Sequence, residues 1–435
     1  MSAAVAGPAE TVFTYAAPAL KFGSFAADEI GHDLAALGAR RVLVVTDPGV
    51  AATGHPERLA GIMRAAGLDA QVWSGSHVEP TDASLREAID HARESGPWDA
   101  FVAIGGGSSI DTAKAVNLLT TNPGELLDYV NAPVGGGRAP SQPLKPLVAV
   151  PTTTGTGSES TTICVLDVLD LKVKSGISHQ WLRPTMAVID PELTMTQPAG
   201  VTASAGMDIL CHALESWTAR PYDSYPRKAP GERVPYCGAN PIADMWAQRS
   251  LTLLASSFRA AVRDGDDHRA RTDMAMAATF AGMGFGNAGV HIPHANAYPV
   301  AGRVHDLGTD FRPAGYDVDE AMVPHGMAVS LTAPAAFAFT HDADPGRHVA
   351  AARVLAHGAG EPDPGEGPDA LPRVVSALMR DIGMPSGLAE IGYGEGDVDA
   401  LVEGAMKQQR LLATAPKAVG PDDLRGIIRA SLHNW

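Results

Sequence analysis

The sequence AFVAIGGGSSIDTAKAVNLL (residues 100–119) leads from an apolar stretch, through three glycines and two serines, into a helix-forming stretch. Glycines at such a turn let the backbone approach a ligand, and the N-terminus of the following helix offers unpaired N–H groups to a phosphate. The same glycines also suit a plain tight turn. We therefore predict a strand–turn–helix unit of a parallel sheet, with a pyrophosphate as its candidate ligand.

Before and after this unit, apolar stretches alternate with helix-forming ones, a pattern typical of a parallel α/β sheet. Helices are expected near residues 55–66 and 83–94. We predict strands at RVLVVTD (41–47), AQVW (70–73), PLVAVPTTTG (146–155) and TMAVIDPEL (185–193), and a hairpin arm at LKVKSGI (171–177). Residues 1–195 are thus predicted to form a Rossmann-like α/β domain.

Beyond Pro198 the chain changes to long stretches rich in alanine, leucine and methionine. Helices are predicted near residues 202–218, 241–263, 267–284, 324–339, 346–357, 371–382, 397–413 and 421–433. The stretches 220–241, 302–324 and 358–369 are rich in proline, glycine and charge, and are predicted to be loops. Residues 196–435 are therefore expected to form an all-α second domain.

Composition narrows the class of function. With 435 residues, of which 45% are hydrophobic, the chain is long enough for two domains. A net charge of −16 argues against binding to nucleic acid or to an anionic membrane and favours small-molecule chemistry. The three cysteines form no Cys-x-x-Cys pair, which indicates a reducing cytoplasm. The first 21 residues resemble neither a secretory signal nor a transit peptide, and no apolar run is long enough to span a membrane.

Two other stretches suit a dinucleotide. Asp47 ends the predicted strand 41–47, where a carboxylate can accept hydrogen bonds from an adenosine ribose and would repel a 2'-phosphate, so NAD is favoured over NADP. A loop-starting residue is the alternative interpretation of Asp47. PTTTGTGSES (151–160) places a row of hydroxyls directly after another predicted strand. All three segments are expected to converge at the carboxyl edge of the sheet.

GMDILCHALESW (206–217) places Asp208 and His212 four residues apart in an otherwise apolar helical run, so that both lie on one helix face. They either form a buried hydrogen-bonded pair or hold a metal ion. His294 and His325, each beside small residues in an apolar segment, are candidate partners for Fe²⁺ or Zn²⁺. Spacing alone leaves alternatives open among the other histidines, namely His179, His291, His305, His341 and His348.

Five motifs together resemble the iron-containing (group III) alcohol dehydrogenase family, in the family's order and over nearly the whole chain. They are GGGSSIDTAKA (105–115), PTTTGTGSE (151–159), GMDILCHALE (206–215), GFGNAGVHIPHANAYPVAG (284–302) and PHGMAVSLTAPAAF (324–337). The resemblance implies the dehydroquinate synthase-like fold of iron alcohol dehydrogenases, with NAD and a divalent metal, Fe²⁺ being favoured and Zn²⁺ the alternative. It also implies small-molecule alcohol and aldehyde substrates and a homo-oligomer.

The resemblance assigns roles to individual residues. Asp208, His212, His294 and His325 match the family's metal ligands. The positions that match its cofactor-binding residues are Gly105, Gly106, Gly107, Ser108 and Asp111 in the pyrophosphate loop, Thr152, Thr153 and Thr156 in a second loop, and Lys174 near the nicotinamide ribose. Tyr298 stands where many members have a histidine assigned to proton transfer, so Tyr298, His291 or ribose hydroxyls acting through water are the candidates for that step. A packing role is the alternative interpretation of Tyr298.

Within the family the chain looks most like the hydroxyacid-oxoacid transhydrogenase branch, through EPTD (79–82), the insertion 220–241, GFGNAGVH (284–291) and the extended loop that follows Tyr298. That branch is expected to oxidise 4-hydroxybutyrate to succinic semialdehyde while reducing 2-oxoglutarate to 2-hydroxyglutarate, with NAD kept bound. The alternatives are an ordinary NAD-dependent alcohol dehydrogenase or aldehyde reductase and, in a different class, a lyase of the dehydroquinate synthase kind.

Overall fold

The computed structural model describes residues 8–171, 173–316 and 318–435, and the chain divides into two compact units. An α/β unit comprises Ala17–Gln197, and a helical unit comprises Pro198–Trp435 together with the N-terminal segment that ends at Ala16. The predicted boundary at 195/196 thus lies two residues before the observed one. The N-terminal segment groups with the helical unit because the Glu10 amide donates to the Tyr225 carbonyl at 2.8 Å and the Ala16 amide donates to Asn287 Oδ1 at 3.0 Å.

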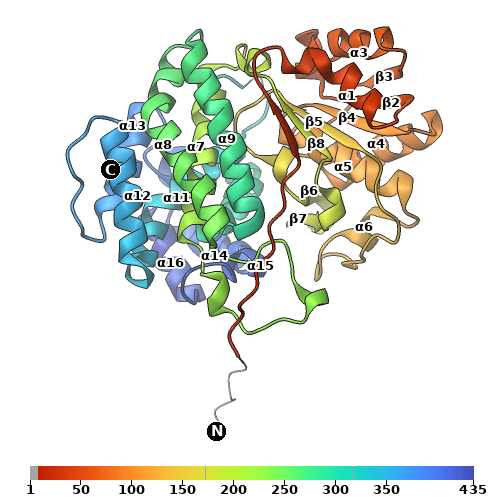
Figure 1. Ribbon diagram of the computed structural model, residues 1–435. Helices are drawn as coiled ribbons and strands as arrows, with labels where there is room; N and C mark the ends of the chain where they lie inside the picture. The colour runs from red at the N-terminus through yellow and green to blue at the C-terminus, as the bar shows by residue number, and fades with distance from the viewer. Residues whose placement is uncertain (1–7, 172, 317) are drawn as a thin grey trace. The chain divides into compact units, whose positions relative to one another are not determined.

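The α/β unit is built on a six-stranded sheet in which all neighbouring strands are parallel (Figure 1). The strand order is β1-β8-β5-β4-β2-β3. The strands are β1 (Ala19–Phe22), β2 (Arg41–Val45), β3 (Asp69–Trp73), β4 (Ala100–Gly105), β5 (Leu147–Pro151) and β8 (Met186–Ile189). The predicted Rossmann-like fold is confirmed, since parallel strands joined by helical crossovers place all their carboxyl ends at one edge.

Helices cover both faces of this sheet because successive side chains of a buried strand point to opposite sides. Val42 and Val44 belong to the core that includes α1 and α3, whereas Leu43 and Val45 belong to the core that includes α4 and α5. The helices of the unit are α1 (Ile30–Ala36), α2 (Pro48–Ala52), α3 (His55–Ala65), α4 (Asp82–Ser95), α5 (Gly107–Thr121) and α6 (Leu126–Tyr129).

A separate two-stranded ribbon follows the second candidate cofactor loop. Strands β6 (Ile163–Val168) and β7 (Val173–Ser178) pair antiparallel, with Asp167 opposite Lys174. The predicted hairpin arm is therefore present, although Lys172 lies outside the described residues. The ribbon is tied to the turn before α4, because the Asp167 amide donates to the Pro80 carbonyl at 2.8 Å.

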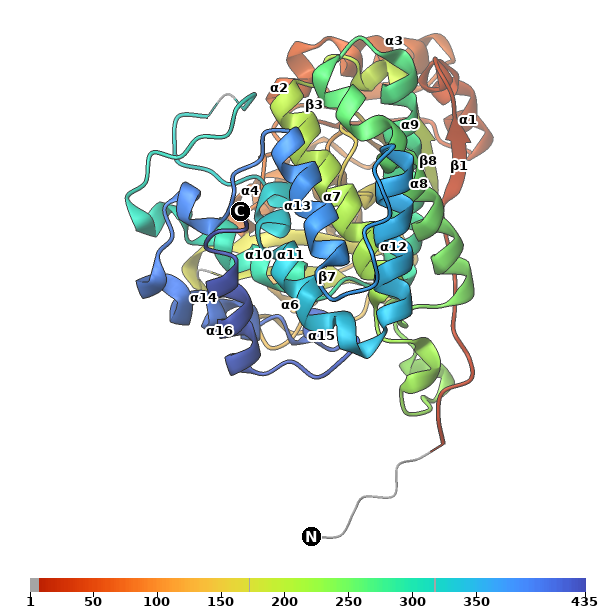
Figure 2. The same cartoon turned by 90° about the vertical axis from the view of Figure 1, so that its left-hand side faces the viewer.

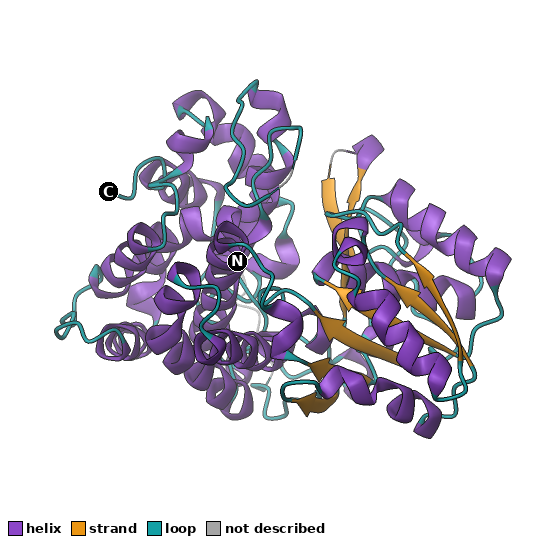
Figure 3. Ribbon diagram, turned by 90° about the horizontal axis from the view of Figure 1, so that it is seen from above, coloured by secondary structure: helices purple, strands orange, loops and turns teal. Residues whose placement is uncertain are grey.

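Within its described residues, the helical unit contains the remaining ten α-helices, and the strands β1–β8 all belong to the other unit (Figure 3). The helices are α7 (Ala199–Thr218), α8 (Pro241–Arg263), α9 (His268–Ala288), α10 (Ile292–Gly302), α11 (His325–Thr340), α12 (Pro345–Gly358), α13 (Ala370–Asp381), α14 (Val398–Met406), α15 (Gln409–Leu412) and α16 (Pro421–Ala430). Helix α7 packs against α8, α9 and α11, and α11 packs against α10 and α13 (Figure 2).

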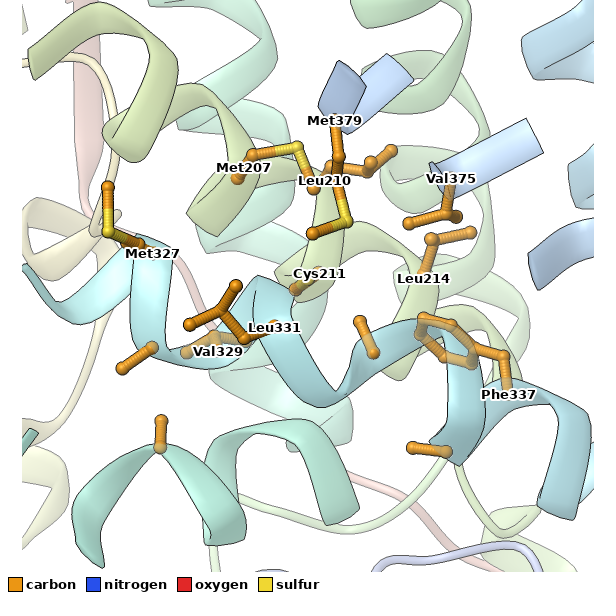
Figure 4. Close-up of a cluster of buried hydrophobic side chains, with 14 of the residues drawn as sticks. Met207, Leu210, Cys211, Leu214, Met327, Val329, Leu331, Phe337, Val375 and Met379 are labelled. Atoms are coloured by element: carbon orange, nitrogen blue, oxygen red, sulfur yellow. The ribbon is translucent and has the colours of Figure 1, made fainter. Parts of the chain in front are cut away.

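A cluster of buried apolar side chains in this unit includes members from three helices (Figure 4). The labelled members are Met207, Leu210, Cys211 and Leu214 on α7, Met327, Val329, Leu331 and Phe337 on α11, and Val375 and Met379 on α13. Helix α7 is therefore buried almost all round, unlike an amphipathic surface helix. Any polar group on α7 must accordingly find a partner inside the protein.

Two helical predictions need correction. Helix α10 was not predicted, because Pro293 and Pro299 interrupt its pattern; Pro293 lies in the first turn, where the missing N–H costs nothing, and Pro299 lies inside the helix. The predicted helix 397–413 is two helices, α14 and α15. None of the helices formed by the described residues has both the length and the apolar character needed to cross a membrane.

Candidate metal centre and cofactor loops

Helix α7 presents three polar side chains on one face, at positions i, i+4 and i+7. They are Asp208, His212 and Glu215, which are 2%, 4% and 0% exposed. On the opposite face of this helix, Gly206 allows α8 to pack closely, because a Cβ at this position would lie 2.1 Å from the ring of Phe258. Phe285 of α9 stacks on His212 with ring centroids 3.8 Å apart, which fixes the plane of the imidazole. The sequence thus places a row of polar groups in an apolar interior.

Two neighbouring helices add His294 and His325. His294 lies in the first turn of α10, and His325 is the first residue of α11. Gly326 lets α11 approach α7 closely, since a Cβ there would lie 2.1 Å from the Ser204 carbonyl oxygen. The Ser204 hydroxyl also accepts a hydrogen bond from the Met327 amide at 3.1 Å. The close contact between these helices therefore brings His325 towards Asp208.

Nitrogens of all three imidazoles surround one carboxylate oxygen. The Nε2 atoms of His294, His212 and His325 lie 3.4, 3.7 and 3.9 Å from Asp208 Oδ1. Ligand atoms of Asp208, His294 and His325 also lie within 4.8 Å of one another, a group that His212 does not join. Metal–ligand bonds of about 2.0–2.2 Å in a tetrahedron place neighbouring ligand atoms roughly 3.4 Å apart. The distances of the three imidazole nitrogens from Asp208 Oδ1 fit that geometry.

Unsatisfied polar atoms point to the same conclusion. Among the residues that the structure describes, Asp208 Oδ1 and His294 Nε2 are buried and have no hydrogen-bond partner. Buried polar atoms normally have one, because desolvation without a hydrogen bond is costly. One carboxylate oxygen and imidazole nitrogens are the donors that iron and zinc accept. The residues present therefore fit a divalent metal ion.

The electrostatics around Asp208 also favour a positive charge. Burial opposes charge on Asp208, but His212, His325 and His294 hold its pKa well below the ordinary value. Burial lowers the pKa of His212 to about 3 against the pull of Asp208, so its ring is a neutral donor. Burial would lower the pKa of His294 too, but Glu215 and Asp208 raise it to about 9. Positive charge is thus favoured between the two carboxylates.

Glu215 is a member of this site that we did not predict. Its Oε1 lies 2.6 Å from His294 Nδ1, and its Oε2 accepts a hydrogen bond from the His291 amide at 2.5 Å. Burial would raise its pKa, but His294 and His291 lower it. A signal was present in the sequence, because Glu215 lies one and two helical turns after His212 and Asp208.

The candidate cofactor loops converge within the α/β unit, as their shared sheet edge predicted. A Cβ on Gly105, whose φ is +157°, would lie 2.4 Å from Ser109 Oγ and 3.2 Å from Asp47 Oδ2. On Gly106 it would lie 3.0 Å from Thr153 Oγ1, and on Gly107 it would lie 2.6 Å from Thr156 Oγ1. The three glycines therefore allow three chain segments to meet at the N-terminus of α5.

Some of the side chains predicted to bind the cofactor already have hydrogen-bond partners in the protein, and one does not. Asp47 caps α2 by accepting from the Val50 amide at 2.9 Å, and its other oxygen accepts from Ser109 Oγ at 3.0 Å. Ser108 Oγ accepts from the Glu79 amide at 3.1 Å. Within the described part of the chain, Thr152 Oγ1 is buried without a hydrogen-bond partner. The loops thus offer a hydroxyl and the backbone of a helix N-terminus to a ligand.

Asp111 and Lys174 are held by the protein itself. Asp111 accepts from the Val165 amide at 2.8 Å and from Ser158 Oγ at 2.5 Å, which ties α5 to the segment after β5. Lys174 Nζ lies 2.6 Å from Glu79 Oε2 and 2.8 Å from Asp167 Oδ2. Burial opposes its charge, but these carboxylates raise the pKa of Lys174 above its ordinary value. Asp111 therefore shapes the loop, and Lys174 is a fixed cation.

The two candidate proton-transfer residues lie in different surroundings. Tyr298 is half-buried on α10, with its ring centroid 6.1 Å from that of His325. His291 is fully buried, its Nε2 lies 3.0 Å from Thr218 Oγ1, and burial lowers its pKa to about 4. The structure therefore places Tyr298 beside the candidate metal ligand His325, whereas His291 is enclosed in the core. The other alternative histidines, His179, His305, His341 and His348, do not belong to the cluster around Asp208.

Comparison with known proteins assigns most of the chain to one family. Residues 17–191 match the family model of iron-containing alcohol dehydrogenase. Residues 233–308 and 314–432 match that of the C-terminal region of the Fe-containing alcohol dehydrogenase family. These two models match segments of both structural units, which shows that the chain belongs to the iron-containing alcohol dehydrogenase family.

Similar proteins carry more specific names. The mitochondrial hydroxyacid-oxoacid transhydrogenases of Bos taurus and Xenopus tropicalis are 41% and 42% identical to this chain, over 97% of its length and 90% and 91% of theirs. A solved 1,3-propanediol oxidoreductase is 29% identical with a TM-score of 0.82, covering 97% of this chain and 100% of its own. Sulfoacetaldehyde reductase from Bifidobacterium kashiwanohense, solved in complex with NAD+, is 27% identical with a TM-score of 0.77, covering 96% and 98%.

The predicted cytoplasmic location is wrong by this comparison, because the transhydrogenases that match nearly the whole chain are named mitochondrial. That prediction used the three cysteines, which are free thiols in the structure. Free thiols indicate a reducing compartment without identifying which one. We also predicted that the first 21 residues do not resemble a secretory signal or a transit peptide. Residues 1–7 of this stretch lie outside the described residues.

Proposed function

Because this chain belongs to the iron-containing alcohol dehydrogenase family, we propose that it is a hydroxyacid-oxoacid transhydrogenase. In this reaction 4-hydroxybutyrate is oxidised at C4 to succinic semialdehyde, and 2-oxoglutarate is reduced at C2 to 2-hydroxyglutarate. The observation that carries the proposal is the match, over 97% of the chain, to relatives that bear this name, combined with four converging candidate ligands.

The proposed metal ligands are Asp208, His212, His294 and His325. A bound divalent ion would polarise the substrate oxygen, and NAD would accept a hydride from the alcohol and return it to the oxoacid. The protein's task is to hold the four donors in place, and the close approach of α11 to α7 that Gly326 allows contributes to this. We propose iron as the working ion, with zinc as the alternative.

The proposed NAD site is the meeting point of the three loops in the α/β unit. Gly105, Gly106 and Gly107 leave backbone N–H groups of α5 open to a pyrophosphate, as a helix N-terminus requires. The Asp47 carboxylate would favour the ribose hydroxyls of NAD and repel the additional phosphate of NADP. Thr152, Thr153 and Thr156 of the second loop complete the proposed site, and Lys174 is proposed to contact the nicotinamide ribose.

Tyr298 is our proposal for the proton step, because it is the candidate that lies beside the cluster while His291 is enclosed in the core. A phenol can give a proton to the alkoxide product of ketone reduction and recover it during alcohol oxidation. A homo-oligomer is also proposed, from the family resemblance alone.

The test is turnover without added cofactor. Purified protein, analysed for metal, is incubated with 4-hydroxybutyrate and 2-oxoglutarate, and 2-hydroxyglutarate is followed by mass spectrometry. We expect product without added NAD. If product forms only when NAD is supplied, and simple alcohols then yield free NADH, the chain is an ordinary alcohol dehydrogenase, as the similarity to 1,3-propanediol oxidoreductase would allow.

A further inference from the structure

Glu215 has the surroundings of a residue that acts through its neighbours. It is fully buried on α7, and its two oxygens contact two different groups near the start of α10. Oε1 faces His294 Nδ1 at 2.6 Å, and Oε2 faces the His291 amide at 2.5 Å. A buried carboxylate is costly unless hydrogen bonds compensate it, so both contacts matter to its stability.

The contact with His294 determines which ring nitrogen carries a proton. A carboxylate is only an acceptor, so Nδ1 must donate to Oε1. The other nitrogen, Nε2, lies 3.4 Å from Asp208 Oδ1, and it is the nitrogen that can give up its proton and offer its lone pair to a cation. Metal-binding histidines commonly depend on such a carboxylate to fix tautomer and ring orientation.

The contact with His291 determines where α10 begins. His291 is the N-cap residue of α10, and its amide donates a hydrogen bond to Glu215 Oε2. His294 follows three residues later. Gly289, with φ +99°, allows the chain to turn just before this point. One side chain therefore fixes both the backbone that carries His294 and the orientation of its ring.

We propose that Glu215 is a positioning residue of the metal centre, which sets the Nδ1–H tautomer of His294 and fixes the start of α10. This inference rests on the proposed function, because it concerns the affinity of the proposed metal site. It predicts that Glu215 controls metal affinity without touching the metal itself.

Glu215→Gln is the informative variant. Glutamine keeps the size but has one acceptor and one donor end, whereas the two neighbours both require acceptors. If its oxygen faces the His291 amide, its NH₂ faces Nδ1 and drives the proton to Nε2. If its oxygen faces Nδ1–H, the buried His291 amide meets a second donor. Either arrangement impairs the site, although size is nearly unchanged.

The measurement is the dissociation constant of Zn²⁺ from the metal-depleted full chain, determined by competition with a chelator. We expect Glu215→Gln to weaken zinc binding roughly 10–100-fold. Ser216→Ala is the matched control, since Ser216 is equally buried on the same helix but faces Gly284; its zinc affinity should stay within about twofold of wild type. Thermal melting of each metal-depleted variant separates weakened binding from weakened folding.

Several results would overturn the inference. Equal zinc affinity of Glu215→Gln and wild type would remove Glu215 from the site, whereas absence of zinc binding by the wild-type chain would overturn the proposed metal function itself. Glu215→Asp keeps the charge, but its side chain is one methylene shorter. We therefore expect the zinc affinity of Glu215→Asp to stay below that of wild type. If Glu215→Asp bound zinc as tightly as wild type, the charge alone would matter, and the proposed positioning role of Glu215 would be excluded.

A measurement on the wild-type chain covers the case in which the variants do not fold. In zinc-loaded protein labelled with ¹⁵N-histidine, we expect His294 to show a protonated Nδ1 and a metal-bound Nε2. Zinc bound through Nδ1 of His294 would contradict the proposed role of Glu215.

Discussion

The metal cluster and the cofactor loops are built by opposite means. Around Asp208, polar side chains converge in an apolar helical interior. Among the described residues, Asp208 Oδ1 and His294 Nε2 have no hydrogen-bond partner there. At Gly105–Gly107, backbone segments meet because side chains are missing. The first site should therefore fail when a side chain is removed, and the second when one is added.

His294→Ala should have the largest effect, because it removes a proposed ligand and leaves Glu215 without its imidazole partner. We expect turnover below detection, loss of bound metal, and a folded but less stable protein, by about 3 kcal/mol or more, since an unpaired buried charge is costly. Metal analysis, turnover and thermal melting measure this. His325→Ala should lose turnover with a smaller loss of stability, and the exposed His357→Ala should change neither. Metal-loaded, active His294→Ala would remove this residue from the ligand set.

Tyr298→Phe tests the proposed proton step. We expect kcat to fall roughly 100-fold or more, the usual range for loss of a positioned acid–base group, while metal content stays that of wild type. A variant with unchanged kcat and pH profile would assign Tyr298 a packing role.

His291→Gln tests whether this histidine is a neutral core residue. Its folded pKa of about 4 lies below the ordinary value of 6.5, because burial disfavours the charged ring. Between these values the unfolded chain binds more protons, so stability falls as the pH falls from about 6.5 to 4. Protonation of His291 should lower the free energy of unfolding by about 3 kcal/mol over this pH range, and His291→Gln should not show this loss. Chemical unfolding at several pH values measures it; parallel curves for variant and wild type would contradict the assignment.

Gly107→Ala tests the cofactor loops by addition of one methyl group. Its Cβ would lie 2.6 Å from Thr156 Oγ1, so the two loops must separate. We expect NAD affinity to fall roughly 10-fold or more with zinc affinity unchanged, because small displacements at such a site are costly. Adding Thr156→Ala should partly restore affinity, and Gly61→Ala, where a Cβ meets open space, is the control. Unchanged NAD affinity would place the pyrophosphate elsewhere.

Asp47→Ser should have the smallest effect. Serine caps a helix about as well as aspartate, so stability should change by only a few tenths of a kcal/mol. The loss of charge should reduce the preference for NAD over NADP about tenfold, which corresponds to about 1.4 kcal/mol. Steady-state kinetics with both cofactors measures this ratio, and an unchanged preference would leave Asp47 only its capping role.

The contrast between the two sites also explains how much could be predicted. The glycine-rich turn and the Asp208–His212 spacing are local patterns, and the structure shows both where they were expected. Glu215 was missed because a glutamate in a helical run is usually exposed, and its burial depends on α10, a helix obscured by Pro293 and Pro299. The placement of residues 8–16 with the helical unit depends on hydrogen bonds to Tyr225 and Asn287, more than 200 residues away, which no local pattern reveals.

The central claim, hydride transfer between two substrates through a retained cofactor, can be tested with an isotope. The protein is incubated with 4-hydroxybutyrate deuterated at C4, with 2-oxoglutarate, and with an excess of unlabelled free NADH. We expect 2-hydroxyglutarate that carries one deuterium at C2 with little dilution, since NAD that stays bound does not mix with the free pool. Product without deuterium would show that the hydride comes from exchanging NADH, and would contradict the transhydrogenase assignment.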